Sequence, residues 1–409
     1  MNDQVLDRAV REVRGRIVAA LAAQFRDFDI AEEAFAAATL GAIEAWRAQG
    51  EPRDPAAWLY AAARRRALDL TRRAKVRRVH PREPLEPAPS VEDIVLAGFE
   101  PIPDERLRLI FTCCHPALEV EARIALTLRV ICGLSVERLA RAFLVSQSAM
   151  TQRLTRAKRK IAMAKIPFVV PGPEAWAERL VAVLAALEIA YAQAYEDASG
   201  LGDASGLADE SLRLSGILCD LMPQEPEVLG FAAMVRLAEA RRGARLDPVG
   251  QTVPLAQQDV GLWNKVMLDQ GFDLLARAAA LGCSGPYQIM AAIHAAHASR
   301  AETGETPWTA VLILYDALIE IRPSPVVVIN RAIALAQVAG PVPALEALEA
   351  LNTDVRVEVF APYHVALAHL ATAADRTDDA RTALIRAINL ITSPAEQQHL
   401  RRNLQALEA

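Results

Sequence analysis

Apolar residues recur at intervals of three and four along most of this chain, and that spacing restricts it to a fold built from amphipathic helices. The first such stripe consists of Val10, Val13, Ile17, Leu21 and Phe25. Hydrophobic residues make up 53% of the 409 residues but aromatic residues only 5%, and much of the hydrophobic content is alanine, a strong helix former. We therefore predict an all-α protein and do not expect a β-sandwich or barrel.

The sequence carries no sign of a membrane or secreted protein. No run reaches the roughly 18 apolar residues that a membrane helix requires. The first ten residues lack the charged-then-apolar pattern of a signal peptide. Five cysteines are a sparse and odd-numbered set, which does not indicate a disulfide framework. We expect a soluble, cytoplasmic protein without a membrane partner.

The net charge of −5 is distributed unevenly along the chain. Residues 1–170 contain 28 Lys and Arg against 21 Asp and Glu, a net charge of +7, which leaves −12 for residues 171–409. Such a division favours a first part that meets a polyanion and a second part that does not. It would also allow the acidic part to fold back on the basic part.

Proline-rich segments divide the chain into helical units. Six prolines between positions 81 and 103 are typical of an extended, semi-rigid linker, and a second proline-bounded joint reads IPFVVPGP. We predict a helical unit at 1–78, a linker at 79–103, a second helical unit at 104–166 and a helical extension at 174–409. Within the first unit, we expect helices from about 30 to 46 and from about 56 to 73, the latter capped by Asp54.

The last third of the chain contains an internal repeat. Ala298, Ala332 and Ala368 are separated by 34 and 36 residues. Twelve residues after each of these alanines lies a second alanine, at positions Ala310, Ala344 and Ala380. Sixteen residues after each lies a leucine, at Leu314, Leu348 and Leu384. Nineteen residues after each lies a further apolar residue, at Ala317, Leu351 and Ala387. This spacing is that of the tetratricopeptide repeat, although the large aromatic positions are mostly missing. Generic antiparallel helix packing is the alternative.

Residues 133–160 carry the sharpest motif. Ser135 can cap a helix that buries Val136, Leu139, Ala140 and Phe143. A tight turn at 144–146 leads to a second helix from Gln147, and its buried stripe would hold Met150, Leu154, Ala157 and Ile161. This is the spacing of a helix-turn-helix, whose second helix enters the major groove of DNA.

The exposed face of that second helix is polar and basic. Five of the eight residues from 153 to 160 are Lys or Arg. Such side chains can reach base edges or phosphates. The candidate DNA contacts are Ser148, Thr151, Gln152, Arg153, Thr155, Arg156, Lys158, Arg159 and Lys160. The alternative interpretation is a solvated basic helix in an ordinary bundle.

A second basic helix ends the first unit. Eight of the fifteen residues from 64 to 78 are Lys or Arg, and an apolar face with Trp58 and Leu59 precedes them. Neutralising several phosphates would give this helix a salt-sensitive affinity for DNA. A solvated helix end is again the alternative. Two basic helices on two small domains suit two separate contacts with DNA.

These residues together resemble an extracytoplasmic-function sigma factor. The segment from Asp29 to Arg73, with Trp46, Gly50 and the run PAAWL at 55–59, is similar to sigma region 2. The helix-turn-helix with RLTRAKRK at its basic end is similar to region 4. The runs FTCCHPAL at 111–118 and IPF at 166–168 resemble the subgroup that carries a tetratricopeptide-like C-terminal extension.

The resemblance implies a protein that binds core RNA polymerase and directs it to promoters, with its activity modulated by the extension. Region 4 would bind the −35 element, and region 2 would read and melt the −10 element. The implied −10 contacts are Arg47, Arg53, Asp54, Trp58, Arg64, Arg65, Arg66, Arg72 and Arg73. The implied polymerase contacts are Asp29, Glu32, Glu33 and Glu44. Trp58 has a second interpretation, as a core residue.

The chain departs from the family pattern at two places. Ala36-Ala37-Ala38-Thr39 stands where the family usually has Gln-Glu-Ala-Phe on the helix that meets the polymerase. Leu144 stands where the turn often has Gly. The first departure weakens the expected contact with polymerase.

Other signals favour structural roles. Adjacent Cys113 and Cys114 point about 100° apart on a helix and have no second Cys/His pair at a fitting spacing, so we predict no metal. His294 and His297 lack an accompanying carboxylate. We find no phosphate loop and no nucleophile–base pair, and therefore expect no cofactor and no enzyme.

Two other functions stay open at this stage. One is a polymerase-independent helix-turn-helix regulator whose C-terminal repeats bind a protein or a small molecule. The other is a helical scaffold or a small-molecule enzyme housed in the repeats.

Overall fold

The computed structural model describes residues 3–76, 106–131, 133–143, 145–168, 175–196, 207–248, 253–282, 284–353, 355–391 and 394–408. These residues form helices and no β-strand, so the predicted all-α class is confirmed. They belong to two compact units, Met1–Leu214 and Ser215–Ala409. The predicted linker at 79–103 and the turn residue Leu144 lie outside the described residues.

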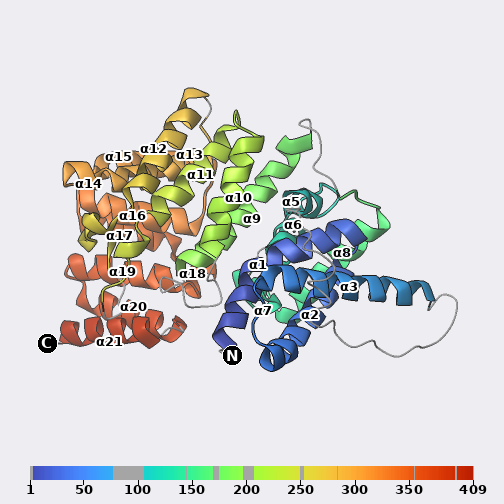
Figure 1. Cartoon of the computed structure of the whole chain (residues 1–409). Helices are drawn as coiled ribbons and strands as arrows, with labels where there is room; N and C mark the ends of the chain where they lie inside the picture. Colours follow the sequence, from blue (N-terminus) through green and yellow to red (C-terminus); the bar gives the residue numbers. More distant parts are fainter. Residues whose placement is uncertain are drawn as a thin grey trace. The chain divides into compact units, whose positions relative to one another are not determined.

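The first unit begins with three helices, α1 (Asp3–Phe25), α2 (Phe28–Gln49) and α3 (Pro55–Val76) (Figure 1). Both connections follow from local signals. Asp27 accepts hydrogen bonds from the N–H groups of Asp29 and Ile30 at the start of α2, and Gly50 ends that helix with a φ of 87°. The Asp54 carboxylate caps α3 by accepting from the N–H of Ala57 at 2.9 Å, as predicted.

Five further helices complete most of the first unit: α5 (Arg106–Cys113), α6 (Val120–Val130), α7 (Val136–Ala142), α8 (Gln147–Met163) and α9 (Trp176–Glu196). The proline-bounded joint predicts that α9 belongs to the extension, but this helix packs on α6 and α5. Buried Arg179 donates to the carbonyl of Phe111 at 3.0 Å, and Trp176 stacks on the Phe111 ring. Helix α10 (Leu207–Leu221) spans the boundary between the units.

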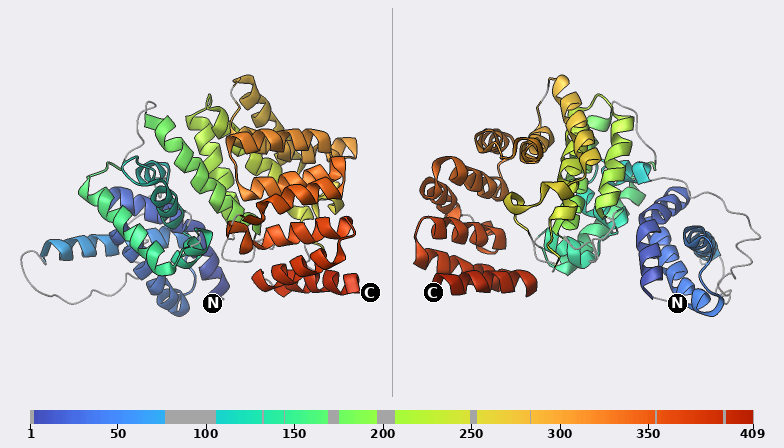
Figure 2. Two further views of the ribbon diagram at one scale, coloured as in Figure 1. Left: turned by 180° about the vertical axis from the view of Figure 1, so that it is seen from behind. Right: turned by 60° about the vertical axis from the view of Figure 1, so that its left-hand side comes forward.

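The second unit is a succession of helices that pack on their neighbours in the chain. It contains α11 (Pro226–Glu239), α12 (Lys265–Ala280), α13 (Pro286–Ala298), α14 (Arg300–Thr303), α15 (Trp308–Ile321), α16 (Pro325–Ala339), α17 (Pro341–Glu349), α18 (Val355–Glu358), α19 (Ala361–Ala373), α20 (Thr377–Leu390) and α21 (Pro394–Glu408). Figure 2 shows the orange to red helices α15 to α21 following one another through this unit.

The second alanine of each predicted repeat copy is buried in the second and third copies but exposed in the first. Ala344 and Ala380 are fully buried at equivalent places in α17 and α20. In the first copy, Ala310 and Ala317 are exposed, and the buried positions of α15 are Val311 and Leu318 instead. The short helix α14 lengthens the connection between α13 and α15, so this pair cannot keep the same spacing.

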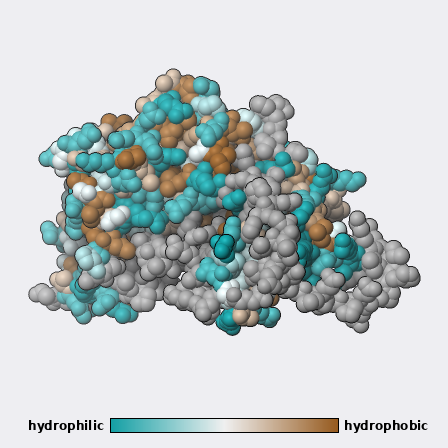
Figure 3. Space-filling view, in the orientation of Figure 1, coloured by the Kyte–Doolittle hydropathy of each residue, from teal (hydrophilic) through white to brown (hydrophobic). Residues whose placement is uncertain are grey.

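Exposed apolar side chains of the described residues are scattered over both units. None of the described helices is long and apolar enough to cross a membrane. On the face drawn in Figure 3, hydrophobic residues of the described part occur in separate groups interrupted by hydrophilic ones. Exposed apolar side chains of this kind are common on folded proteins.

Candidate nucleic-acid interface

Helices α7 and α8 form the predicted helix-turn-helix. Ser135 accepts a hydrogen bond from the N–H of Arg138 at 3.2 Å and caps α7. Ser146 caps α8 by accepting from the N–H of Ala149, also at 3.2 Å. The buried residues of α8 are Met150, Leu154, Ala157 and Ile161, the stripe that the sequence predicts. The core side of α8 therefore fixes which side chains face outward.

The outward face of α8 presents polar and basic side chains. Thr151 and Thr155 are exposed, and each hydroxyl donates to a backbone carbonyl one turn earlier in the helix. The other exposed candidates are Ser148, Gln152, Arg156, Arg159 and Lys160. A row of side chains along one exposed helix face is the arrangement that major-groove recognition needs.

Arg153 lies at the edge of this face and contacts its own domain. Its guanidinium pairs with Glu121 at 2.8 Å and lies 5.7 Å from the centre of the Phe143 ring. The side chain keeps 24% of its exposure. These contacts hold it against α6 and α7, and its DNA role stays a prediction.

The basic face of α3 lies on the other part of the first unit. Arg65 and Arg72 are exposed, whereas Arg64, Arg66 and Arg73 are partly buried. Arg66 lies 3.8 Å from Glu33 of α2. The C-terminal half of α3 extends beyond α1 and α2 in both Figure 1 and Figure 2.

Trp58 does not belong to that face. It is 1% exposed and meets Trp46 edge to face, with ring centres 5.6 Å apart. Tyr60 is 7% exposed. A ring buried in this way has no surface for an unpaired base, so the core interpretation of Trp58 replaces its assignment as a −10 contact. The remaining −10 candidates at the α2–α3 connection, Arg47, Arg53 and Asp54, are exposed.

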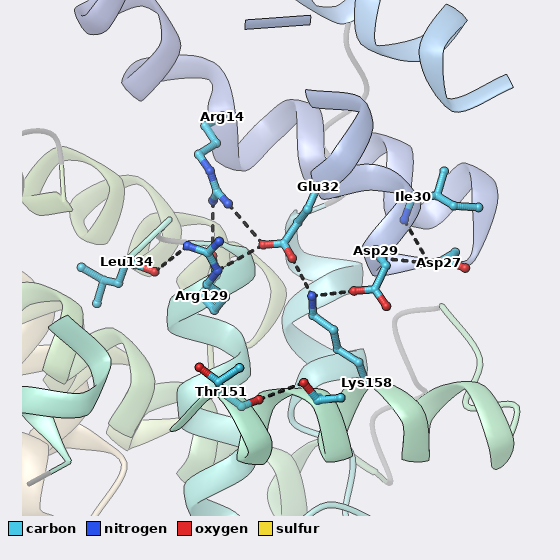
Figure 4. Close-up of polar contacts among 10 residues, drawn as sticks. Arg14, Asp27, Asp29, Ile30, Glu32, Arg129, Leu134, Thr151 and Lys158 are labelled. Atoms are coloured by element: carbon cyan, nitrogen blue, oxygen red, sulfur yellow. Dashed lines mark hydrogen bonds and ion pairs between the residues drawn. The ribbon is translucent and has the colours of Figure 1, made fainter. Parts of the chain in front are cut away.

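The four acidic residues implied in polymerase binding fall into two groups. Glu33 and Glu44 are exposed on α2. Glu32 instead lies at the centre of an ion-pair cluster with residues far away in the chain (Figure 4). One of its carboxylate oxygens lies 3.3 Å from both Arg14 and Arg129, and the other is 2.5 Å from the ammonium of Lys158.

Asp29 joins the same cluster. Its carboxylate lies 2.9 Å from Lys158, so this lysine of α8 bridges two acidic residues of α2 (Figure 4). Only 16% of the Lys158 side chain stays exposed. Burial lowers the pKa of Lys158, but the carboxylates of Glu32 and Asp29 outweigh that effect and raise the pKa above its ordinary value. A predicted DNA contact and two predicted polymerase contacts therefore bind one another.

Close packing surrounds the cluster. Gly15 of α1 faces the carbonyl of Ile131, and a Cβ at this glycine would lie only 2.4 Å from that oxygen. Arg14 donates to the carbonyl of Arg129 at 3.3 Å. The rings of Phe28 and Phe168 lie 5.2 Å apart. The sequence patterns did not reveal this contact. Its one local signal is a glycine inside α1, where most residues would favour the helix more.

The FTCCHPAL segment has a structural role. Cys113 and Cys114 are fully buried, and burial raises the pKa of the Cys114 thiol to about 11. His115 accepts a hydrogen bond from the N–H of Ala117. Arg123 holds the following turn by donating to two of its carbonyls, at 2.7 and 2.8 Å. Within the described ranges, no three His, Cys, Asp or Glu side chains lie close enough together to hold a metal.

The histidine pair of α13 is also explained by local contacts. A guanidinium nitrogen of Arg241 lies 2.9 Å from His294 Nδ1. Burial, with Arg241 next in effect, lowers the pKa of His294 well below its ordinary value, so the ring is neutral and accepts this hydrogen bond. His297 meets the Trp308 ring edge to face at 5.4 Å.

Comparison with known proteins agrees with this description. Residues 108–161, which run from within α5 to within α8, match the family described as Sigma-70, region 4. Residues 179–279 match a family of unknown function, DUF6596. An uncharacterized protein of Rhizobium meliloti (strain 1021) is 39% identical over 408 residues, which is 99% of this chain and 96% of that relative. No solved structure matches the chain. The chain therefore belongs to the same family as this Rhizobium meliloti protein, and its region 4 domain supports its assignment as a sigma-70 family factor.

Proposed function

We propose that this protein is an alternative sigma factor of the extracytoplasmic-function type, which binds core RNA polymerase and directs it to promoters. It acts as an initiation factor in the cytoplasm and not as an enzyme. Its catalytic partner is the polymerase, and its own contribution is to recognise DNA and position the complex.

The observation that carries this proposal is the agreement between the region 4 match and the surface of α8. The matched residues contain α7 and α8 up to Ile161, and the exposed face of α8 is polar and basic. Arg156, Arg159 and Lys160 suit phosphates, and Gln152 suits a base edge. In the proposed complex this face binds the −35 element.

The three-helix bundle of α1 to α3 takes the other two roles. The exposed basic side chains of α3 and of the α2–α3 connection bind the −10 element, namely Arg47, Arg53, Arg65 and Arg72. The exposed acidic residues Glu33 and Glu44 of α2 bind the polymerase. Asp29 and Glu32 of the same helix join that surface when Lys158 releases them.

The helices after residue 215 serve a regulatory purpose in this proposal. Their stacked pairs and the two repeat copies that stay in register resemble a tetratricopeptide array. Such arrays bind segments of other proteins or small ligands on an extended surface. The extension would modulate the activity of the first unit in this way.

Co-elution of the full-length protein with core RNA polymerase on a sizing column tests the proposal. We expect a stoichiometric complex. Failure of the intact protein to co-elute, with duplex DNA binding retained, would reject the sigma function.

The DNA surface is tested on a short duplex in a salt series. Replacing Arg156 and Arg159 by alanine should weaken binding and reduce the salt slope by about one for each phosphate that is no longer neutralised. Replacing Arg401 and Arg402 of α21 by alanine removes the same charge elsewhere in the chain and serves as the matched control. Equal effects of the two double variants would contradict a specific role for α8.

One observation favours a polymerase-independent regulator as a second candidate. Ala36 is exposed on α2, and Leu40, one turn later, is 66% exposed. Ala36 and Ala37 occupy the position at which the resembled family carries a polar pair, and Leu40 extends this apolar strip by one turn. If the natural protein fails to co-elute and the double variant Ala36→Gln, Ala37→Glu succeeds, the sigma scaffold has a weakened polymerase surface.

A further inference from the structure

We propose that the ion-pair cluster centred on Glu32 is an autoinhibitory latch. It holds α8 against α2, withholds Lys158 from DNA, and withholds Glu32 from polymerase. A promoter-competent protein arises when the latch opens. This inference rests on the proposed sigma function and adds its regulation.

The ion pairs of the cluster exclude the contact between Lys158 and a DNA phosphate. Lys158 and Glu32 each keep only 16% of their side-chain exposure, because they face one another (Figure 4). The carboxylates of Asp29 and Glu32 occupy the position that a DNA phosphate would take on Lys158. A lysine held at 2.5 and 2.9 Å by two carboxylates cannot bind a phosphate at the same time.

The charge balance of the cluster favours competition. Three cations, Arg14, Arg129 and Lys158, converge on the carboxylates of Glu32 and Asp29. An incoming polyanion such as DNA can compete with these carboxylates for the cations of the cluster. Asp29 keeps 80% of its side-chain exposure, which gives a competitor access to the outer edge. Ion pairs at such an edge are held less strongly than a buried apolar core.

The lack of a side chain at Gly15 permits α1 to pack closely against the end of α6. The two domains approach at Gly15, where the backbone carbonyl of Ile131 fills the space of a Cβ. Arg14, the preceding residue, reaches across to the Arg129 carbonyl and to Glu32. A single methyl group at position 15 would therefore separate α1 from α6 without changing any charge.

The experiment measures opening and DNA binding separately in the full-length protein. Two fluorescent labels, introduced as unnatural amino acids at the exposed positions 40 of α2 and 162 of α8, report the distance between the helices. Fluorescence anisotropy with a short mixed-sequence duplex reports DNA affinity in the same buffer. Both are measured without polymerase.

Two variants open the latch by different physical means. Glu32→Gln removes the central charge, and Gly15→Ala introduces the steric conflict while favouring α1 as a helix. Glu119→Gln is the matched control, since this carboxylate of the first unit is exposed and its side chain does not cap α6. Circular dichroism verifies that each variant keeps its helices.

We expect both opening variants to lengthen the label distance and to bind DNA roughly tenfold more tightly, because the competent state no longer has to be selected from a minor population. Glu119→Gln should match the natural protein in both readouts. An unchanged distance in Glu32→Gln and Gly15→Ala would overturn the latch, and a longer distance with no gain in affinity would overturn its inhibitory role. Failure of the natural protein and the charge-preserving Gly15→Ala variant to co-elute with polymerase would instead reject the proposed function.

Discussion

The contacts inside each of the two compact units differ in how far apart their partners lie in the sequence. In the first unit, Lys158 binds Asp29 and Glu32, which lie 129 and 126 positions earlier in the chain. In the second unit, helices pack mainly on the next helices along the chain. Its ion pair between Arg331 and Asp316 spans 15 residues. The second unit also has longer contacts, since Glu227 accepts from the N–H groups of Tyr287 and Gln288 60 and 61 positions later, but these separations are shorter than those of the Lys158 contacts.

The difference has consequences for stability and for function. A stack of helices with nearest-neighbour contacts loses stability locally when one contact is removed. A unit in which two separately folded segments bind each other can also adopt an open arrangement, with both segments folded but no longer in contact. We therefore expect a core substitution in the second unit to destabilise only the neighbouring helices. A substitution at the ion-pair cluster of the first unit should instead shift the balance between its closed and open arrangements.

The largest effect should come from the core of the first three helices. Trp58→Ala removes a fully buried ring from its contact with Trp46 and should cost about 3–5 kcal/mol of unfolding free energy. Denaturant unfolding followed by circular dichroism would measure this loss. A stable Trp58→Ala variant with impaired promoter melting would restore the base-stacking interpretation and break the comparison.

A comparable substitution in the second unit should act over a shorter range. Leu348→Ala empties a fully buried position of α17 and should cost about 2–5 kcal/mol. Hydrogen exchange should show reduced protection in α16, α17 and α19, the helices around this core cluster, with α1 to α3 unchanged. Simultaneous loss of protection in both units would contradict the local organisation that we infer.

Acid should act on the second unit through its buried histidines. Burial, reinforced by Arg241 and Arg300, lowers the pKa of His297 to about 4. In the unfolded chain this group takes up a proton near its ordinary pKa of 6.5. Acidification from pH 6.5 to about 4 therefore favours unfolding, because only the unfolded chain binds the proton in this range. The contribution of the neutral His297 ring to the free energy of unfolding is fully present above pH 6.5.

Replacement of this histidine tests that effect. His297→Leu should shift the acid midpoint of unfolding to lower pH by roughly half a unit. His399→Leu, at an exposed position of α21, is the control. Equal midpoints for the two variants would exclude His297 as a source of acid sensitivity.

The smallest effect is expected at the surface of the second unit. Arg331→Ala removes a partly exposed ion pair with Asp316, which should cost about 0.2–1 kcal/mol. Thermal unfolding at low and high salt would measure it, and the difference from the natural protein should shrink as salt rises. A loss of several kcal/mol would show that surface charge organises this unit more than apolar packing does.

Local features of the fold could be predicted from the sequence. Ser135 marks the start of α7, and the spacing of Met150, Leu154 and Ala157 fixes the buried face of α8. Asp54 before Pro55 marks the start of α3. Each of these signals acts within a few residues, where caps and helical periodicity determine the conformation.

Contacts between distant segments could not be predicted in the same way. Glu32 and Lys158 have the residue types of an ion pair, but more than a hundred residues separate them, and charge alone does not select the partner. The first repeat copy illustrates a related difficulty. Its alanine spacing matches the later copies, yet Val311 occupies the buried position because α14 changes the connection. Trp58 had two interpretations in sequence, and only burial decides between them.

The docking of α9 determines where this chain can be divided for experiments. A truncated protein ending at residue 173 would strip Trp176 from the Phe111 ring and leave the Phe111 carbonyl without the Arg179 donor. Any loss of DNA binding would then reflect a damaged scaffold. A truncated protein ending at Glu196 keeps this helix and removes the later ones. Comparing DNA binding by the two truncated proteins would separate two effects. Loss of α9 would show damage to the first unit, and loss of the later helices alone would show whether they regulate it.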